Sequence, residues 1–242
     1  MLLRRVTGHV QRQDWFAVGV DFAIVVVGVF VGIQVSNWNE GRIDRTTGER
    51  HLAEIAEDLQ EHLEFHEILY SSALARIGAA NFLLEAAGRP VPQGELRFSV
   101  GGYSVPDAPA VPENQLNNIL GWLNLVRVTV SARKGYESLI SSGNLGLLRN
   151  RELARQIQRY YGQYDDLLDT QKLFREFRNE GVRAGYALGL SAFDQRPIDE
   201  VVSIVRESDA YAAYVRTTRE WAILHAGMLE GLLLDTEALL AA

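Results

Sequence analysis

The sequence predicts an all-α protein, in which one N-terminal transmembrane helix is followed by an up-and-down helical bundle with a Pro/Gly-rich loop. Three observations lead to this prediction. A 21-residue stretch near the N-terminus is almost entirely apolar, later stretches repeat apolar residues at three- and four-residue spacing, and five of the six prolines fall within residues 88–112. The chain has no cysteine, so disulfides are excluded. Its 242 residues are enough to bury a core without them.

The transmembrane helix is predicted at residues 15–37. At ~1.5 Å per residue, the stretch from Trp15 to Val35 matches a hydrocarbon core of ~30 Å, and no side chain from Phe22 to Asn39 is ionisable. Aromatic residues stand near both ends, as in an interfacial belt: Trp15, Phe16 and Trp38. A cleaved signal peptide is the alternative, but the residues that follow the apolar stretch lack a small-x-small cleavage pattern.

The orientation of this helix rests on a weaker signal, because three arginines precede the span and three follow it closely. Residues 1–14 hold their three arginines with one acid, whereas residues 40–242 carry 29 acidic and 21 basic side chains. We therefore expect residues 1–14 to be a cytoplasmic tail and residues 38–242 to be an extracytoplasmic domain. In a cell with two membranes, that domain is periplasmic and the span crosses the inner membrane.

One face of the predicted span carries a carboxyl group and two glycines. At 100° per residue, Asp21, Gly28, Gly32 and Asn39 fall within about 20° of one line on the helix. The two glycines form a GxxxG motif, which lets helices approach closely in lipid. The line therefore predicts a helix-packing face, and the alternative is that Asp21 snorkels to the interface while the glycines contact lipid.

Two stretches resemble an uncharacterised family of bacterial single-pass membrane proteins. The segment from Asp21 to Glu40 has an acid, an apolar run with glycine, and then Gln-Val-Ser-Asn-Trp-Asn-Glu, a close variant of the family's Gln-x-Asn-Asn-Trp-Asn-Glu. Residues 136–145, Tyr-Glu-Ser-Leu-Ile-Ser-Ser-Gly-Asn-Leu, look like its central motif, together with Leu153 and the Tyr160-Tyr161 pair. The family typically has Glu where Asp21 stands and Asn at position 36. The resemblance implies a membrane-anchored helical extracytoplasmic protein and no catalytic activity.

Helical periodicity continues through most of the remaining chain. Apolar residues predict a long amphipathic helix from about Arg45 to Ala87, either separate from the membrane helix or continuous with it. Residues 88–112 are predicted to form a loop, in which two alternating stretches flank Gly101-Gly102 as in a small hairpin. Capping residues and apolar spacing predict four further helices. The first covers residues 113–125, and the second is capped by Ser131 and closed by Gly143. A long helix begins after Asn150, and after a break at Pro197 a last helix runs from about Ser208 to Leu240.

No motif for catalysis or metal binding emerges from the histidines and acids. His62 and His66 share a helical face, but Leu63 stands where a zinc protease motif requires Glu, and no histidine has a Glu three residues before it. Glu54, Asp58 and His62 lie on one ridge, which a cation site or, more commonly, a solvated charged face would explain. We therefore expect no metal and no cofactor.

The aromatic residues of the later helices are candidates for the core or for an interface. Tyr160, Tyr161 and Tyr164 span both sides of one helical turn, so we expect one or two in the core and another at a protein interface. Core packing is the alternative for all three. His225 stands on an apolar stripe and is expected to be a core histidine.

These observations favour a non-enzymatic, membrane-anchored accessory or assembly subunit that binds another membrane or periplasmic protein, or a second copy of itself. The net charge of −7, with no basic cluster, argues against a nucleic-acid partner. Neither a nucleophile motif nor a phosphate-binding loop occurs. The alternative is an extracytoplasmic ligand-sensing bundle, which would have to signal through a separate protein because its cytoplasmic tail is short. An apolar cavity with convergent polar groups would favour the sensor, and a large exposed apolar patch over a packed interior would favour the subunit.

Overall fold

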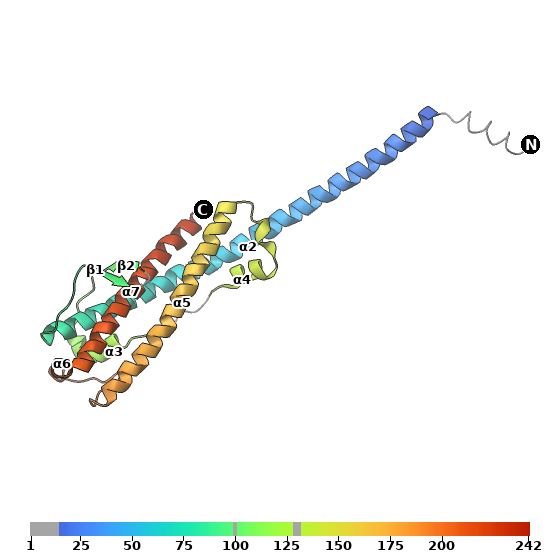
Figure 1. Ribbon diagram of the computed structural model, residues 1–242. Coiled ribbons are helices and arrows are strands. Elements are labelled where there is room, and N and C mark those ends of the chain that lie inside the picture. The colour runs from blue at the N-terminus through green and yellow to red at the C-terminus, as the bar shows by residue number, and fades with distance from the viewer. Residues whose placement is uncertain (1–14, 99–100, 128–131) are drawn as a thin grey trace, which may run out of the picture.

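A computed structural model describes residues 15–98, 101–127 and 132–242. Its dominant element is α2 (Trp15–Ala86), one continuous helix of 72 residues and about 110 Å. No proline interrupts the chain before Pro90, so the predicted membrane helix and the helix that follows it form a single rod. The first part of α2 projects alone, and the second part joins a helical body (Figure 1). The helix ends before Gly88, whose φ of 70° suits a C-terminal cap.

The body is built on three long helices, which confirms the all-α prediction. α7 (Asp209–Leu240) packs against both α2 and α5 (Arg151–Tyr186), and side chains of α2 contact α5. As predicted, Asn150 caps α5 by accepting hydrogen bonds from the backbone amides of Glu152 and Leu153, both at 3.1 Å. Ser208 caps α7 in the same way.

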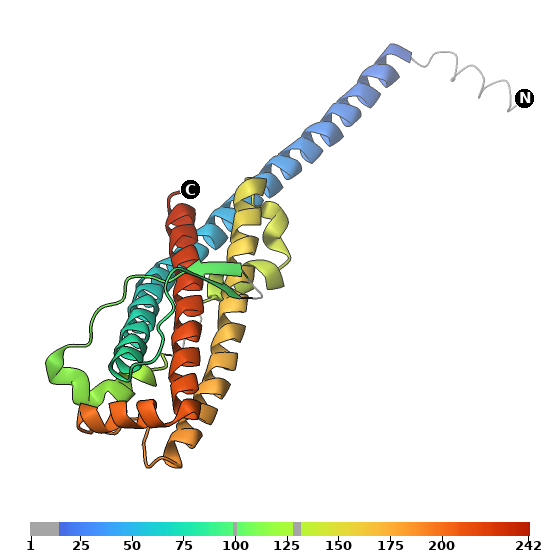
Figure 2. The ribbon, with the colours of Figure 1, turned by 60° about the vertical axis from the view of Figure 1, so that its left-hand side comes forward.

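The three long helices do not alternate in direction as an up-and-down bundle requires. At one level of the core, residue 62 of α2 contacts residue 160 of α5, which contacts residue 236 of α7. At the next level, residue 76 of α2 contacts residue 225 of α7, which contacts residue 171 of α5. α2 and α5 are therefore parallel, and α7 is antiparallel to both, as the ribbon also shows (Figure 2). The reason is the connection between α2 and α5, which runs back along the length of the body before α5 begins.

That connection contains the predicted hairpin, but its glycines are not in the turn. β1 (Glu95–Phe98) pairs antiparallel with β2 (Gly101–Ser104), and Gly101 and Gly102 lie opposite Phe98 and Arg97. The expected Gly-Gly turn is thus wrong, because the two glycines are strand residues. Short helices follow the hairpin: the 3₁₀-helix η1 (Glu113–Asn118), α3 (Ile119–Leu123), α4 (Lys134–Ser141) and the 3₁₀-helix η2 (Asn144–Leu147).

α4 begins without a side-chain cap of its own. Ser131, the predicted cap, lies outside the described residues, and Arg133 occupies the capping position. The carboxylate of Asp58 on α2 instead accepts a hydrogen bond of 2.8 Å from the backbone amide of Gly135. A buried carboxylate is favourable there, because the first turn of a helix has unpaired N–H groups and a positive dipole end. Gly143, with φ of 70°, closes α4 as predicted.

One further helix, α6 (Ile198–Glu207), was not predicted. It begins directly after Pro197, its first turn carries Asp199 and Glu200, and it buries Val201, Val202 and Val205. It lies across the end of the body farthest from the projecting helix (Figure 1).

Candidate functional site

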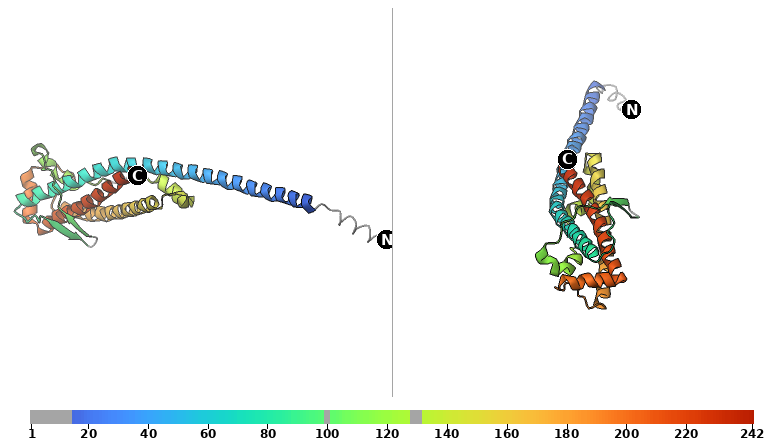
Figure 3. Two further views of the ribbon diagram at one scale, coloured as in Figure 1. Left: turned by 90° about the horizontal axis from the view of Figure 1, so that it is seen from above. Right: turned by 90° about the vertical axis from the view of Figure 1, so that its left-hand side faces the viewer.

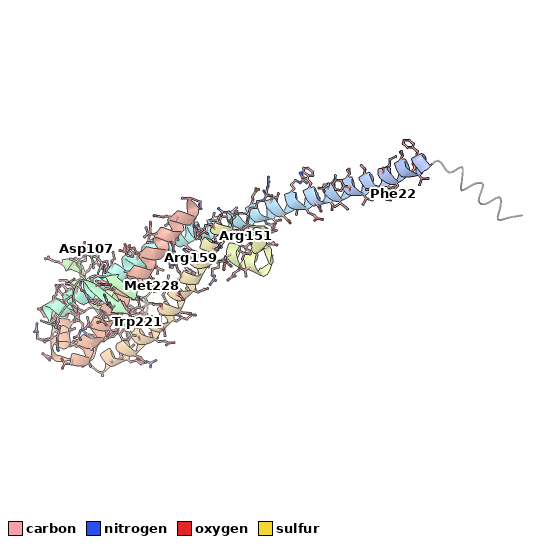
Figure 4. All side chains as sticks on the ribbon, turned by 45° about the horizontal axis from the view of Figure 1, so that its top comes forward. Phe22, Asp107, Arg151, Arg159, Trp221 and Met228 are labelled. Atoms are coloured by element: carbon pink, nitrogen blue, oxygen red, sulfur yellow. The ribbon has the colours of Figure 1, made fainter. Side chains whose placement is uncertain are left out.

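The projecting part of α2 has the length and composition of a membrane span. An 18-residue window near the N-terminus has a mean hydropathy of 2.3, and none of it is buried. Phe22 and its neighbours extend freely around the helix (Figure 4), and the helix runs straight out from the body with only gentle curvature (Figure 3). Among the described residues, this is one helix able to cross a membrane.

The predicted packing face of the span is open within this chain. Asp21, Gly28, Gly32 and Asn39 are all exposed. A Cβ atom built on Gly28 or Gly32 would meet no other atom within 4 Å. The structure therefore gives the two glycines no role inside the chain, and a contact with another helix stays a prediction.

This prediction can be tested by filling the space above the glycines. If the face packs against a helix in the membrane, Gly28→Ile or Gly32→Ile should weaken self-association or partner recovery, because a bulky side chain blocks the approach of a second backbone. Val29→Ile, on another face, is the matched control and should have little effect. A bacterial two-hybrid assay or crosslinking in membranes ranks the three variants, and equal signals would show that lipid surrounds the glycines.

Inside the body, polar side chains line the contact between the three long helices. We call this set the polar seam, and each of its members is less than 9% exposed: Asp58, His62, His66 and Arg76 on α2, Tyr160, Tyr161, Tyr164 and Gln171 on α5, and His225 and Thr236 on α7. The expectation of a solvated charged face for the ridge of Glu54, Asp58 and His62 is wrong, because Asp58 and His62 are both buried. Only Glu54 remains partly exposed.

At one end of the seam, His62 joins all three helices. Its Nδ1 lies 2.8 Å from the hydroxyl of Tyr160, which also accepts a hydrogen bond of 3.1 Å from Thr236. Its ring stacks on Tyr164, with centroids 4.4 Å apart, and on His66, at 5.5 Å. Neither ring nitrogen of His66 has a hydrogen-bond partner among the described residues.

Both histidines are held neutral by their surroundings. Burial lowers the pKa of His62 to about 4, against a smaller opposing effect of the Asp58 carboxylate. Burial and the neighbouring His62 lower the pKa of His66 to about 4. Protonation of either ring in the folded state is therefore unfavourable at neutral pH.

The three tyrosines, one of which was predicted to reach an interface, are all in the core. Tyr160 and Tyr161 are 1% exposed, and Tyr164 is fully buried, so the expectation that one would face outward is wrong. The reason is the position of α4, which covers a face of α5 that two neighbouring helices alone would leave open. Tyr136 of α4 stacks on Tyr161 with centroids 4.0 Å apart, and Arg133 lies over the same ring at 5.7 Å.

In the middle of the seam, a buried arginine faces a buried histidine. The Arg76 Nη2 lies 2.9 Å from His225 Nδ1, and its guanidinium lies 4.6 Å above the ring of Phe174. Because a guanidinium can only donate, Nδ1 accepts and the proton of neutral His225 is on Nε2. The side-chain Nε2 of Gln171 lies 3.0 Å from that nitrogen.

The charge of Arg76 has no acidic partner among the described residues. It is 3% exposed, forms no ion pair there, and its Nε is buried without an acceptor. Burial lowers its pKa to about 10, so the group is still charged at neutral pH. Burial and the charge of Arg76 in turn lower the pKa of His225 well below its ordinary value, which keeps the imidazole neutral.

Arg76 opens onto a cavity of about 190 Å³ between α2 and α5, which we call the arginine pocket. Its lining includes Arg76, Gln171 and His225, together with three exposed basic side chains: Arg127, Lys172 and Arg175. None of the described residues that line the pocket is acidic. Lys172 forms an ion pair of 2.8 Å with Asp169, which lies outside the lining.

On the other side of α5 lies a larger open cavity of about 780 Å³, which we call the acidic groove. Its charged residues are Asp166 and Asp169 of α5 and Glu220 of α7, and none of the described lining residues is basic. Its apolar residues include Trp221 and Met228, which lie along α7 (Figure 4). The remaining apolar lining residues are Phe98, Tyr103, Leu173, Leu224 and Leu232.

The hairpin forms part of the wall of the acidic groove. Tyr103 of β2 lies against Gly227 of α7 so closely that a Cβ atom on that glycine would overlap the tyrosine ring. The ring of Phe98 lies 5.9 Å from the Tyr103 ring, and both side chains line the groove. Gly227 is therefore needed for the hairpin to dock on the helix.

Among the described residues, no group of three or more His, Cys, Asp or Glu is placed to hold a metal ion. The polar seam carries neutral imidazoles and one unpaired cation, and the two cavities carry opposite charges on opposite faces of α5. No protein-family model, curated protein sequence or solved structure matches this chain.

Proposed function

We propose that this chain is a non-enzymatic, single-pass membrane protein whose helical domain binds a segment of another protein in the acidic groove. In this proposal, residues 1–14 are cytoplasmic, residues 15–37 cross the inner membrane, and residues 38–242 lie in the periplasm. The observation that carries it is the groove itself, which combines an apolar wall with three carboxylates and no basic residue among its described lining.

The groove favours one chemical class of partner segment. Leu173 is 56% exposed in the groove, and Trp221 and Met228 are only partly buried, so an apolar partner would remove this surface from water. Asp166 and Glu220 would attract and orient basic side chains, whereas Asp169 is already paired with Lys172. The partner segment is therefore expected to carry both apolar and Lys or Arg residues. A volume of about 780 Å³ is enough for several side chains.

Photo-crosslinking from the groove tests this proposal in membranes. A benzophenone amino acid at Leu173 of the full chain should crosslink to a peptide of another protein that contains basic and apolar residues. Asp166→Asn combined with Glu220→Gln should reduce the yield several-fold, because the basic side chains lose their partners. Ile68, which is 45% exposed on α2 and outside the groove, is the matched control position.

Two outcomes would contradict the proposal. Equal crosslinking from positions 68 and 173 would show that the groove has no special affinity. Crosslinks from position 173 that map only to a second copy of this chain would assign the groove to self-association.

A ligand-sensing bundle is the second candidate function. The observation that favours it is the arginine pocket, which brings polar side chains from α2, α5 and α7 together around a cavity of about 190 Å³. The two functions are compatible, because the cavities lie on different faces of α5.

A further inference from the structure

We propose that the arginine pocket binds a small, doubly charged soluble oxyanion, such as a dicarboxylate or a phosphate, with Arg76 as its central contact. This inference does not depend on the acidic groove. It rests on the burial of Arg76, on the absence of acidic residues from the described lining, and on the size of the cavity.

The buried charge of Arg76 is the first argument. Moving a cation out of water costs several kcal/mol, and folded proteins usually recover this cost with a carboxylate partner. Among the described residues, the guanidinium contacts a neutral imidazole and the face of Phe174 and forms no ion pair. An anion in the pocket would supply the missing opposite charge.

The arrangement of the other basic residues is the second argument. Arg127, Lys172 and Arg175 also line the cavity, although the chain as a whole has a net charge of −7. On α5, at 100° per residue, Arg175 lies about 180° and Lys172 about 120° from the centre of the acidic groove, so both basic residues lie away from the groove side of this helix. A local reversal of sign on an acidic protein attracts anions to this face.

The size and position of the pocket select a small soluble anion. A cavity of about 190 Å³ holds a molecule of a few heavy atoms, not a protein segment. Arg76 follows Val35, the last residue of the apolar stretch, by 41 positions, which corresponds to about 60 Å along the continuous helix α2. The headgroups of the membrane that this chain would cross are therefore out of reach.

Calorimetric titration of the full chain in a neutral detergent tests the inference. The probes are inorganic phosphate, sulfate and succinate, added at an ionic strength kept constant with chloride. We expect saturable binding of at least one probe, and the preferred probe distinguishes phosphate-like from carboxylate ligands. Arg76→Met should weaken this binding at least about tenfold, because it removes a charged donor.

Two surface variants keep the test independent of folding. Arg175→Gln removes an exposed rim charge and should weaken binding several-fold, whereas Arg159→Gln removes an equally exposed arginine on the opposite face of α5 and should leave it unchanged. Arg76→Met should also unfold at a temperature no lower than the anion-free wild type, since it removes an unpaired buried charge. The inference is overturned if no probe saturates up to about 20 mM, or if Arg76→Met or Arg175→Gln binds as tightly as the wild type.

Discussion

Gly135→Ala is expected to lower the free energy of unfolding by about 2–4 kcal/mol, although it adds a single methyl group. Gly135 is buried in the first turn of α4, where this helix meets α2. A Cβ atom there would lie 2.5 Å from the carbonyl carbon of Glu54 and 2.6 Å from the backbone nitrogen of Ile55. These are backbone atoms inside a continuous helix, so they cannot rotate aside and α4 must move.

That movement would also break a buried hydrogen bond. The backbone amide of Gly135 donates to Asp58 at 2.8 Å, and this carboxylate is 6% exposed. A shift of α4 would leave a buried charged group without a donor, which costs more than the bond itself contributes. The stacking of Tyr136 on Tyr161 would be strained by the same shift.

Gly162→Ala is the matched control for this prediction. Gly162 is exposed in α5, and a Cβ atom there would meet nothing within 4 Å. Alanine is the better helix former, so this variant should raise the free energy of unfolding by about 0.5–1 kcal/mol. Urea unfolding of the full chain in detergent, followed by far-UV circular dichroism, compares the two. If both alanine variants shift stability in the same direction, the close contact of α4 with α2 is not as described.

The helices were predictable because their signals are local. Periodic apolar residues, the side-chain cap at Asn150 and the glycines at positions 88 and 143 lie within a few residues of the features they determine. α6 had such a signal too, since Pro197 is followed by two acids and by valines at positions 201, 202 and 205. The loop prediction was correct for the residues around the hairpin, but a two-glycine sequence did not distinguish a turn from a strand.

The polar seam could not be predicted, because its partners are far apart in the sequence. Asp58 caps a helix 77 residues away, His62 contacts a tyrosine 98 residues away, and Arg76 contacts a histidine 149 residues away. A helical ridge of acid and histidine is normally solvated, and here it is buried because α4 packs over Asp58 and α5 lies beside His62. The direction of α5 depends in turn on the connection between the two helices, whose path no periodic pattern specifies.

The last prediction concerns acid. The body is expected to lose stability as the pH falls from 6.5 to about 4, because His62 and His66 have a pKa of about 4 when folded and about 6.5 when unfolded. Buried His225, whose pKa is also lowered, acts in the same direction. Above pH 6.5 both states are neutral and the stability is fully present. Below that, the unfolded chain binds protons first, so the free energy of unfolding falls as the pH approaches 4. At pH 5, each histidine should cost about 2 kcal/mol.

The groups around the two rings set the direction of this effect. Asp58 would favour a protonated His62, but burial outweighs it and Arg133 opposes it. For His66, burial and His62 act in the same direction, and neither ring nitrogen has a hydrogen-bond partner among the described residues. Protonation of both rings would be more unfavourable still, because the two positive charges would repel each other across a centroid distance of 5.5 Å.

Two variants separate the titration of the rings from their packing. His66→Phe removes one titrating group but keeps a ring in the cluster, so the loss of stability between about pH 7.5 and about pH 5 should shrink by about 2 kcal/mol. Tyr160→Phe removes the hydroxyl that lies 2.8 Å from His62 and keeps both histidines. It should lower stability at every pH by about 1 kcal/mol while preserving most of the slope. Urea unfolding at several pH values measures each slope, and an unchanged slope in His66→Phe would mean that other groups cause the acid sensitivity.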